Sequence, residues 1–136
     1  VRVFDGITNR AELAALVAFV HSLVVYFDEC LERGEDLPIL QPWHVKENKW
    51  RAARYGLEAE VILDPECHER LVTDDLHDLL EQITPTAARL GCADELARVA
   101  DSPVRGASYQ RQRRVAEATG GDLVAVVDSL VDELRA

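Results

Sequence analysis

A short stretch in the first half of the chain concentrates side chains that can hold an anion. Residues 47 to 60 read ENKWRAARYGLEAE and place Lys49, Arg51 and Arg54 beside Trp50. A guanidinium group binds a carboxylate or a phosphate through two parallel hydrogen bonds, a geometry that an ammonium group cannot copy. An indole ring can stack on a guanidinium or on a ligand ring. The stretch therefore predicts either a site for an anionic ligand or a set of structural ion pairs, and the spacing alone favours neither.

A second candidate lies at the start of the chain. Arg2 stands between Val1 and Val3 in residues that read as a short strand, and Asp5 follows at the strand's end. An arginine between apolar strand residues usually faces a polar cavity or a buried acid, because its charge must be paired or hydrated. We therefore expect Arg2 to face a polar cavity, with a structural ion pair as the alternative.

A third basic cluster lies near the end of the chain. The segment RGASYQRQRR carries Arg105, Arg111, Arg113 and Arg114 around Tyr109. These arginines could reach phosphates or acidic partners. Since the neighbouring helices are acidic, the pattern is more typical of a solvated helix face that offsets their charge.

The sequence contains none of the common metal or phosphate motifs. Cys67 and His68 are adjacent, but the histidines and cysteines do not show the spacing of a zinc site. A glycine-rich phosphate loop and a GxSxG nucleophile motif are also missing. We therefore expect no metal ligands in this sequence and interpret Cys67 and His68 as parts of a surface turn.

Composition limits the classes of function. The chain has 136 residues, of which 48% are hydrophobic, and a net charge of −10. Such acidity argues against binding to nucleic acids or anionic lipid surfaces, which need a basic face, and no apolar run reads as long enough to span a bilayer. Three widely spaced cysteines do not form a disulfide framework. We expect a cytoplasmic protein without nucleic-acid or membrane partners.

The first long element that must position these residues is a helix from Thr8 or Asn9 to Arg33, where Gly34 ends it. Glu12 lies three residues after Asn9, the spacing of a capping box. This helix is apolar almost all round, and such a helix is normally buried on several faces. We expect it to be covered by a larger protein or by a partner, and we expect self-association as a homodimer where it is not.

The remaining elements are also mostly helical. A helix from Pro42 to Tyr55, ended by Gly56, carries the basic stretch. Alternating residues near 58–63, with a returning segment at 70–73, predict a hairpin. The later helices are expected at 73–83, 85–90, 94–100, 107–119 and 123–134. The fold class is therefore α+β, predominantly α-helical, with short strands near 1–5 and 58–63.

The two N-terminal segments resemble the carboxylate–amine ligase family, also called glutamate–cysteine ligase type 2. That family carries an E-x-R-x-x-D strand, a long helix rich in Ala, Leu and Val, and an N-[RK]-W-x-A-x-R-x-G-L segment. The matching residues here are Arg2, Asp5, Asn48, Lys49, Trp50, Ala52, Arg54, Gly56 and Leu57. The closing helices also resemble the family, and the similarity covers essentially the whole chain but only about the last third of a family member.

The resemblance implies an ATP-dependent ligase that phosphorylates a carboxylate, typically the side chain of glutamate. An amine such as that of cysteine then attacks the acyl phosphate to give an amide. Mg²⁺ held by acidic residues neutralises the phosphates. On this basis Arg2 is the expected catalytic residue, and Arg54, Asn48 and Lys49 are expected to line or brace a substrate- or phosphate-binding cavity. The two strands would belong to the antiparallel sheet of the larger ligase.

The chain lacks parts of the family pattern. The glutamate expected two residues before Arg2 is missing, as are the upstream strands that should hold Mg²⁺ and most of the ATP. The sequence also contains no methionine. We therefore expect residues 1–136 to be a C-terminal portion of one ligase domain that is inactive alone. The alternative is a non-catalytic helical module that binds partners or dimerises on the same scaffold.

Overall fold

Helices make up most of the chain, and two short strands complete it, as the α+β prediction expected. The computed structural model describes residues 7–37 and 39–135. In order, the elements are α1 (Arg10–Glu32), α2 (Pro42–Tyr55), the 3-10 turn η1 (Gly56–Glu58), β1 (Glu60–Ile62), β2 (Glu69–Leu71), α3 (Val72–Leu90), α4 (Ala93–Ala97), the 3-10 turn η2 (Arg98–Asp101), α5 (Ser102–Arg105), α6 (Ser108–Ala118) and α7 (Leu123–Arg135). The expected strand near 1–5, with Arg2 and Asp5, lies outside the described residues.

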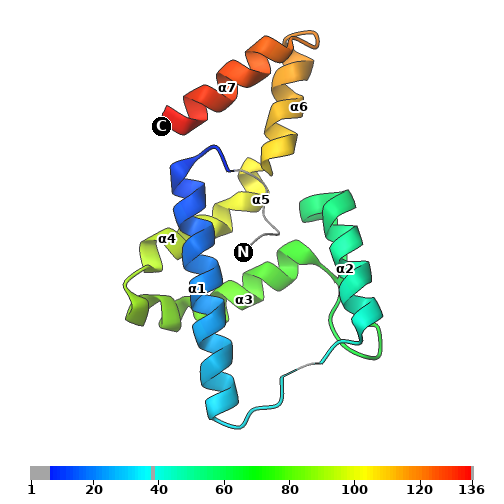
Figure 1. Ribbon diagram of the computed structural model, residues 1–136, viewed down its shortest axis with the longest axis vertical. Helices are drawn as coiled ribbons and strands as arrows, with labels where there is room; N and C mark the ends of the chain where they lie inside the picture. Colours follow the sequence, from blue (N-terminus) through cyan, green and yellow to red (C-terminus); the bar gives the residue numbers. More distant parts are fainter. Residues whose placement is uncertain (1–6, 38, 136) are drawn as a thin grey trace.

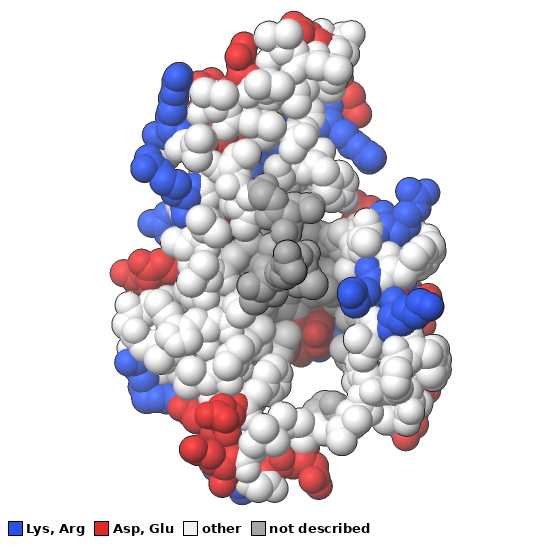
Figure 2. Space-filling view, viewed as in Figure 1, with Lys and Arg blue, Asp and Glu red and all other residues white. Residues whose placement is uncertain are grey.

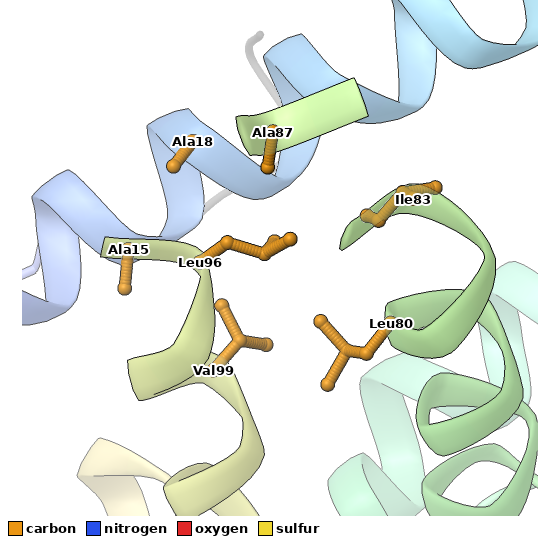
Figure 3. Close-up of a cluster of buried hydrophobic side chains, with 7 residues drawn as sticks. All are labelled: Ala15, Ala18, Leu80, Ile83, Ala87, Leu96 and Val99. Carbon is orange, nitrogen blue, oxygen red and sulfur yellow. The ribbon is translucent and has the colours of Figure 1, made fainter. Parts of the chain in front are cut away.

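The core lies where α1 crosses α3 and α4 (Figure 1). Its buried side chains are Ala15, Ala18, Leu80, Ile83, Ala87, Leu96 and Val99 (Figure 3). Three of them are alanines, and small side chains let helix backbones approach closely. Ile83 and Leu96 supply most of the volume because both are almost completely buried. Their burial holds α3 and α4 against α1, which positions the segment from η2 to α6.

The N-terminus of α1 is capped as expected, but the cap is one-sided. The side-chain oxygen of Asn9 accepts a hydrogen bond from the amide of Glu12 at 2.9 Å. In a full capping box the glutamate side chain would bond back to the amide of the cap residue. Here the Glu12 carboxylate instead pairs with Arg111. Glu12, the acid of the expected capping box, therefore forms a tertiary contact between α1 and α6 instead of closing the cap.

The expectation of two helices at 73–83 and 85–90 was wrong. A single helix, α3, runs from Val72 to Leu90 and contains Pro85. Proline removes one main-chain donor from a helix and strains the preceding turn. Pro85 lies on the exposed side of α3, whereas Ile83 and Ala87 on either side of it are fully buried. Tertiary packing on these two residues keeps the helix continuous.

A small hairpin follows α2 and gives the chain its described sheet. Strands β1 and β2 pair in antiparallel register, with Val61 opposite Arg70. Gly56 separates α2 from this hairpin and has φ 59° and ψ −126°. A side chain there would also meet the hydroxyl of Tyr109, since a Cβ atom would lie 3.0 Å from it. The positive φ favours glycine, and a larger residue would also require the Tyr109 side chain to shift by a few tenths of an ångström.

Helix α1 corrects one further expectation. It has 23 residues, and its most apolar part has a mean hydropathy of 1.6, so by length and composition it is able to cross a membrane. The statement that no apolar run is long enough was therefore wrong. The core helix of a soluble protein passes the same test, and α1 packs against α3 and α4 through Ala15 and Ala18. On this side α1 is part of the core, although only 22% of its most apolar part is buried.

Candidate functional site

A cavity of about 590 Å³ lies between the first half of α1, the η2–α5 segment and the start of α6. One part of its wall is apolar and includes Ala15, Leu16 and Val99. The other part carries polar and charged groups, namely Glu12, Arg98, Asp101, Ser102, Arg105, Ser108, Tyr109, Arg111 and Gln112. A concave apolar surface with converging polar groups is the usual form of a small-molecule site. This cavity is the candidate site of the described chain.

Arg111 organises one wall of the cavity. Its guanidinium pairs with Glu133 at 2.8 Å and with Glu12 at 2.9 Å, and it donates to the carbonyl of Gly106 at 2.7 Å. Its side chain is 15% exposed, and those of both acids are 23% exposed. The guanidinium thereby joins α1, α6 and α7 across long sequence separations. Arg111 is therefore a structural link, and its donors are occupied by the protein.

The Arg111 guanidinium also controls the ionisation of Glu133. Its hydrogen bond to Glu133, followed by that of Thr8, holds the pKa of this carboxyl below its usual range. A carboxyl whose pKa is lowered on folding stabilises the protein above its unfolded pKa, and that stability is lost as the pH falls. We call the set Arg111, Glu12 and Glu133 the Arg111 cluster.

The Arg111 cluster predicts a pH dependence of stability. On lowering the pH from 7 to 3.5, the free energy of unfolding should fall less in Glu133→Gln than in the unchanged chain, because glutamine has no proton to gain. Urea unfolding at both pH values measures the difference. Glu117→Gln, an exposed change on α6, is the matched control and should follow the unchanged chain. Equal losses in all three proteins would contradict the prediction.

Asn48, an expected ligand-binding residue, lies on the inner side of α2 against β1. Its amide nitrogen donates to the carbonyl of Ile62 at 2.8 Å, and its oxygen accepts from the amide of Ile62 at 2.8 Å. Both polar atoms of the side chain are thus engaged with the main chain. This geometry braces strand β1 against α2, and a role of Asn48 in lining or bracing a ligand cavity stays a prediction.

This contact predicts a loss of stability in Asn48→Ala. The change removes two hydrogen bonds and leaves the main chain of Ile62, a residue that is 3% exposed, without these partners. We expect the free energy of unfolding to fall by about 2 kcal/mol. Lys46→Ala on the exposed side of the same helix should change it by less than about 0.5 kcal/mol. Chemical denaturation of both variants tests this, and similar values would count against the bracing role.

Lys49 and Arg54 are both exposed on α2. Figure 2 shows positive side chains gathered over this helix. No hydrogen bond or ion pair joins either residue to another described residue. Arg51 behaves differently, because it pairs with Glu47 at 2.9 Å and with Glu69 at 2.8 Å. The structure therefore divides the basic stretch into a structural arginine and two exposed cations.

The C-terminal end of α2 reaches the cavity. Leu57 and Tyr109 both line the cavity, and Gly56 lies against the ring of Tyr109. Arg54 precedes Gly56 by two residues and does not line the cavity. Lys49, one turn further back, is more distant along the helix. Arg2 lies outside the described residues and stays a prediction.

The Cys67–His68 turn shows no metal geometry. His68 pairs with Asp64 at 2.6 Å, and this hydrogen bond raises the pKa of the His68 imidazole. Cys67 instead contacts the buried ring of His44 at 3.4 Å. Within residues 7–37 and 39–135, no three His, Cys, Asp or Glu side chains are grouped as metal ligands. The assignment of Cys67 and His68 to a surface turn fits these contacts, and the Mg²⁺ ligands stay a prediction for other parts of the ligase.

The sequence reading missed the cavity and the roles of Glu12 and Glu133. It placed Arg111 in a solvated helix face, whereas the structure buries most of its side chain. Arg113 fits that interpretation better, since it is exposed and lies 5.4 Å from the centre of the Tyr109 ring. Arg111 lies one helical turn before the apolar Val115, and this shared side of the helix was the available signal for Arg111.

Comparison with known proteins identifies the family. The model of glutamate–cysteine ligase family 2 matches residues 1–129. A protein of Rhodococcus jostii (strain RHA1), named "Putative glutamate--cysteine ligase 2-2", is 75% identical over 134 residues, which are 98% of this chain and 36% of that protein. The protein of the same name in Nocardia farcinica is 66% identical over 98% of this chain and 35% of its own length.

A third relative, named "Putative glutamate--cysteine ligase 2-3", comes from a Nocardioides species and is 65% identical over 99% of this chain. The chain spans about a third of the length of these curated relatives, 36% in the Rhodococcus protein. The family match covers nearly all of this chain, and it agrees with the resemblance carried by residues 48–57. The chain belongs to glutamate–cysteine ligase family 2.

Proposed function

We propose that this chain is a C-terminal portion of an ATP-dependent carboxylate–amine ligase that joins a glutamate-like acid to a cysteine-like amine. The observation that carries the proposal is the family match over residues 1–129. In the proposed reaction the acid's carboxylate takes the γ-phosphoryl group of ATP, and ADP leaves. The amine nitrogen then attacks the acyl carbon, phosphate leaves, the nitrogen loses a proton, and an amide bond remains.

The described residues suit a supporting part in this reaction. The cavity wall combines an apolar side with groups of both charges, Arg105 and Arg98 beside Asp101. Such a wall is compatible with an amino acid, which carries a positive and a negative group on a small body. Lys49 and Arg54 offer exposed positive charge on α2, whose C-terminal end meets the cavity, and this charge would stabilise an anionic reactant. Arg2 is proposed as the catalytic residue facing the same site.

The cofactors are assigned mainly to parts of the family outside this chain. Phosphoryl transfer depends on cations that neutralise the phosphate oxygens, and Mg²⁺ is the usual one. Because the upstream strands of the family are expected to supply the Mg²⁺-binding carboxylates, we place Mg²⁺ and most of the ATP contacts on the remaining part of the ligase. We derive no step through Mg²⁺ from these residues. The proposal further places the protein in the cytoplasm, with no nucleic-acid or membrane partner.

A chimera tests the proposed function. It carries this chain in place of the matching segment of the Rhodococcus jostii relative, and the unmodified relative is the reference. With ATP, Mg²⁺, glutamate and cysteine, we expect ADP release and a product with the mass of the two amino acids less one water. Omitting either amino acid should stop both. An active reference with a silent chimera, or ADP release without amide, would overturn the proposal and favour a non-catalytic binding module.

A further inference from the structure

Helix α1 carries an exposed apolar face on the side away from the core. Its members recur at alternating steps of four and three residues, and Val17 is 60% and Val24 62% exposed. The exposed members are Leu13, Val17, Val24, Phe27 and Leu31, with the half-buried Val20 between them. From Leu13 to Leu31 the face extends about 27 Å along the helix axis. An apolar surface of this length marks an interaction site.

The face is broad and uncharged. No Lys, Arg, Asp or Glu occurs between Glu12 and Asp28, and Figure 2 shows few charged atoms over the middle of α1. The exposed neighbours of the stripe include Ala14 and His21. A helix that pairs with a second copy in a coiled coil usually flanks a narrow apolar seam with charged residues that select the partner. Their absence here is typical of a helix buried inside a larger core.

The family comparison shows how much chain is available to cover this face. Residues of this chain match 36% of the Rhodococcus relative, so nearly two thirds of the length of that protein lies outside the match. We propose that the exposed face of α1 is the contact surface for this remaining part of the ligase domain, which completes a core that α3 and α4 cover on one side alone. The inference rests on family membership and not on the ligase chemistry.

The test compares one pair of substitutions in two settings. Val17→Glu with Val24→Glu is introduced into the 136-residue chain and into the chimera with the Rhodococcus relative, and Tm is measured by thermal unfolding. In the chain alone the side chains face water, so Tm should change by less than about 3 °C. In the chimera two carboxylates would be buried in an apolar contact, so Tm should fall by about 10 °C or more.

Two matched variants distinguish the loss of this contact from a general failure of the chimera to fold. Val104→Glu, at a site that is 87% exposed on α5, should change Tm little in either setting. Val24→Thr keeps the side-chain shape and replaces one methyl group by a hydroxyl, so it should lower Tm by about 2 °C or more in the chimera and leave Tm of the chain alone unchanged. Far-ultraviolet circular dichroism establishes that each variant retains its helices.

Equal, small shifts in the two settings would overturn the inference. It would also be overturned if the chimera were unaffected while light scattering showed a dimer of the chain that Val17→Glu and Val24→Glu dissolve, since a second copy would then cover the face. Binding to phosphatidylcholine vesicles that these substitutions abolish, again with an unaffected chimera, would identify a lipid surface instead. A chimera with the expected Tm losses but no ligase activity would overturn the proposed function and support this inference.

Discussion

Replacing Arg111 by leucine is expected to lower the free energy of unfolding by about 3 kcal/mol. The change leaves the partly buried carboxylate of Glu133 without its cation and leaves Glu12 with the longer contact to Arg105 at 3.4 Å, and it removes the donor to the Gly106 carbonyl. Breaking a buried ion pair costs more than the pair itself contributes, because the remaining charge is still poorly hydrated. Urea unfolding at pH 7 of the 136-residue chain measures the loss.

Two further variants separate the Arg111 cluster from a general effect of charge. Arg113→Leu removes the same charge from an exposed position on the same helix and should cost less than about 1 kcal/mol. Adding Glu12→Gln and Glu133→Gln to Arg111→Leu should recover part of the loss, since no unpaired charge then remains. If Arg111→Leu and Arg113→Leu were equally destabilising, Arg111 would have no special role in linking α1, α6 and α7.

Local signals in the sequence located most of the helices. Asn9 is the N-cap of α1, with the expected hydrogen bond to Glu12, and Gly56 ends α2 with a positive φ. These features depend on a few neighbouring residues, so the sequence carries them directly. The break at Pro85 was misread because the burial of Ile83 and Ala87 depends on α1 and α4, which no local pattern shows.

The candidate site was less predictable because its contacts are distant in sequence. Glu12 meets Arg111 across 99 residues, and nothing in the pattern around either residue specifies the other. The basic stretch shows the same limit at shorter range. Asn48 could bind a ligand or the main chain, and its two hydrogen bonds to Ile62 depend on where the hairpin folds back. Residue types indicated the chemistry, whereas tertiary contacts assigned each residue its partner.

Exposure separates the roles of the arginines on α2. The guanidinium of Arg51 pairs with Glu47 and Glu69 and donates a hydrogen bond to the carbonyl of Glu60 at 3.1 Å. Arg51 thereby holds the hairpin against the helix. Arg54 is exposed beside Gly56, at the end of α2 that meets the cavity. Because no ion pair joins the Arg54 guanidinium to another described residue, its charge is available to bind a ligand. Among the basic residues of this stretch, Arg54 is therefore the one whose replacement should lower activity most clearly without lowering the stability of the fold.

Replacing Arg54 by alanine in the ligase chimera is expected to lower turnover about 100-fold and to change Tm by less than about 2 °C. Loss of one positive group that stabilises developing negative charge typically has an effect of this size. Lys46→Ala, an exposed cation on the same helix, should leave turnover within about twofold, and Arg51→Ala should lower Tm. Turnover is measured as ADP release at saturating ATP, glutamate and cysteine.

A parallel loss of Tm and turnover in Arg54→Ala would assign Arg54 to folding, and full activity would remove it from the site. An isolated loss of turnover would place the exposed end of α2 at the reacting anion, because no structural ion pair to a described residue then explains the need for the Arg54 charge.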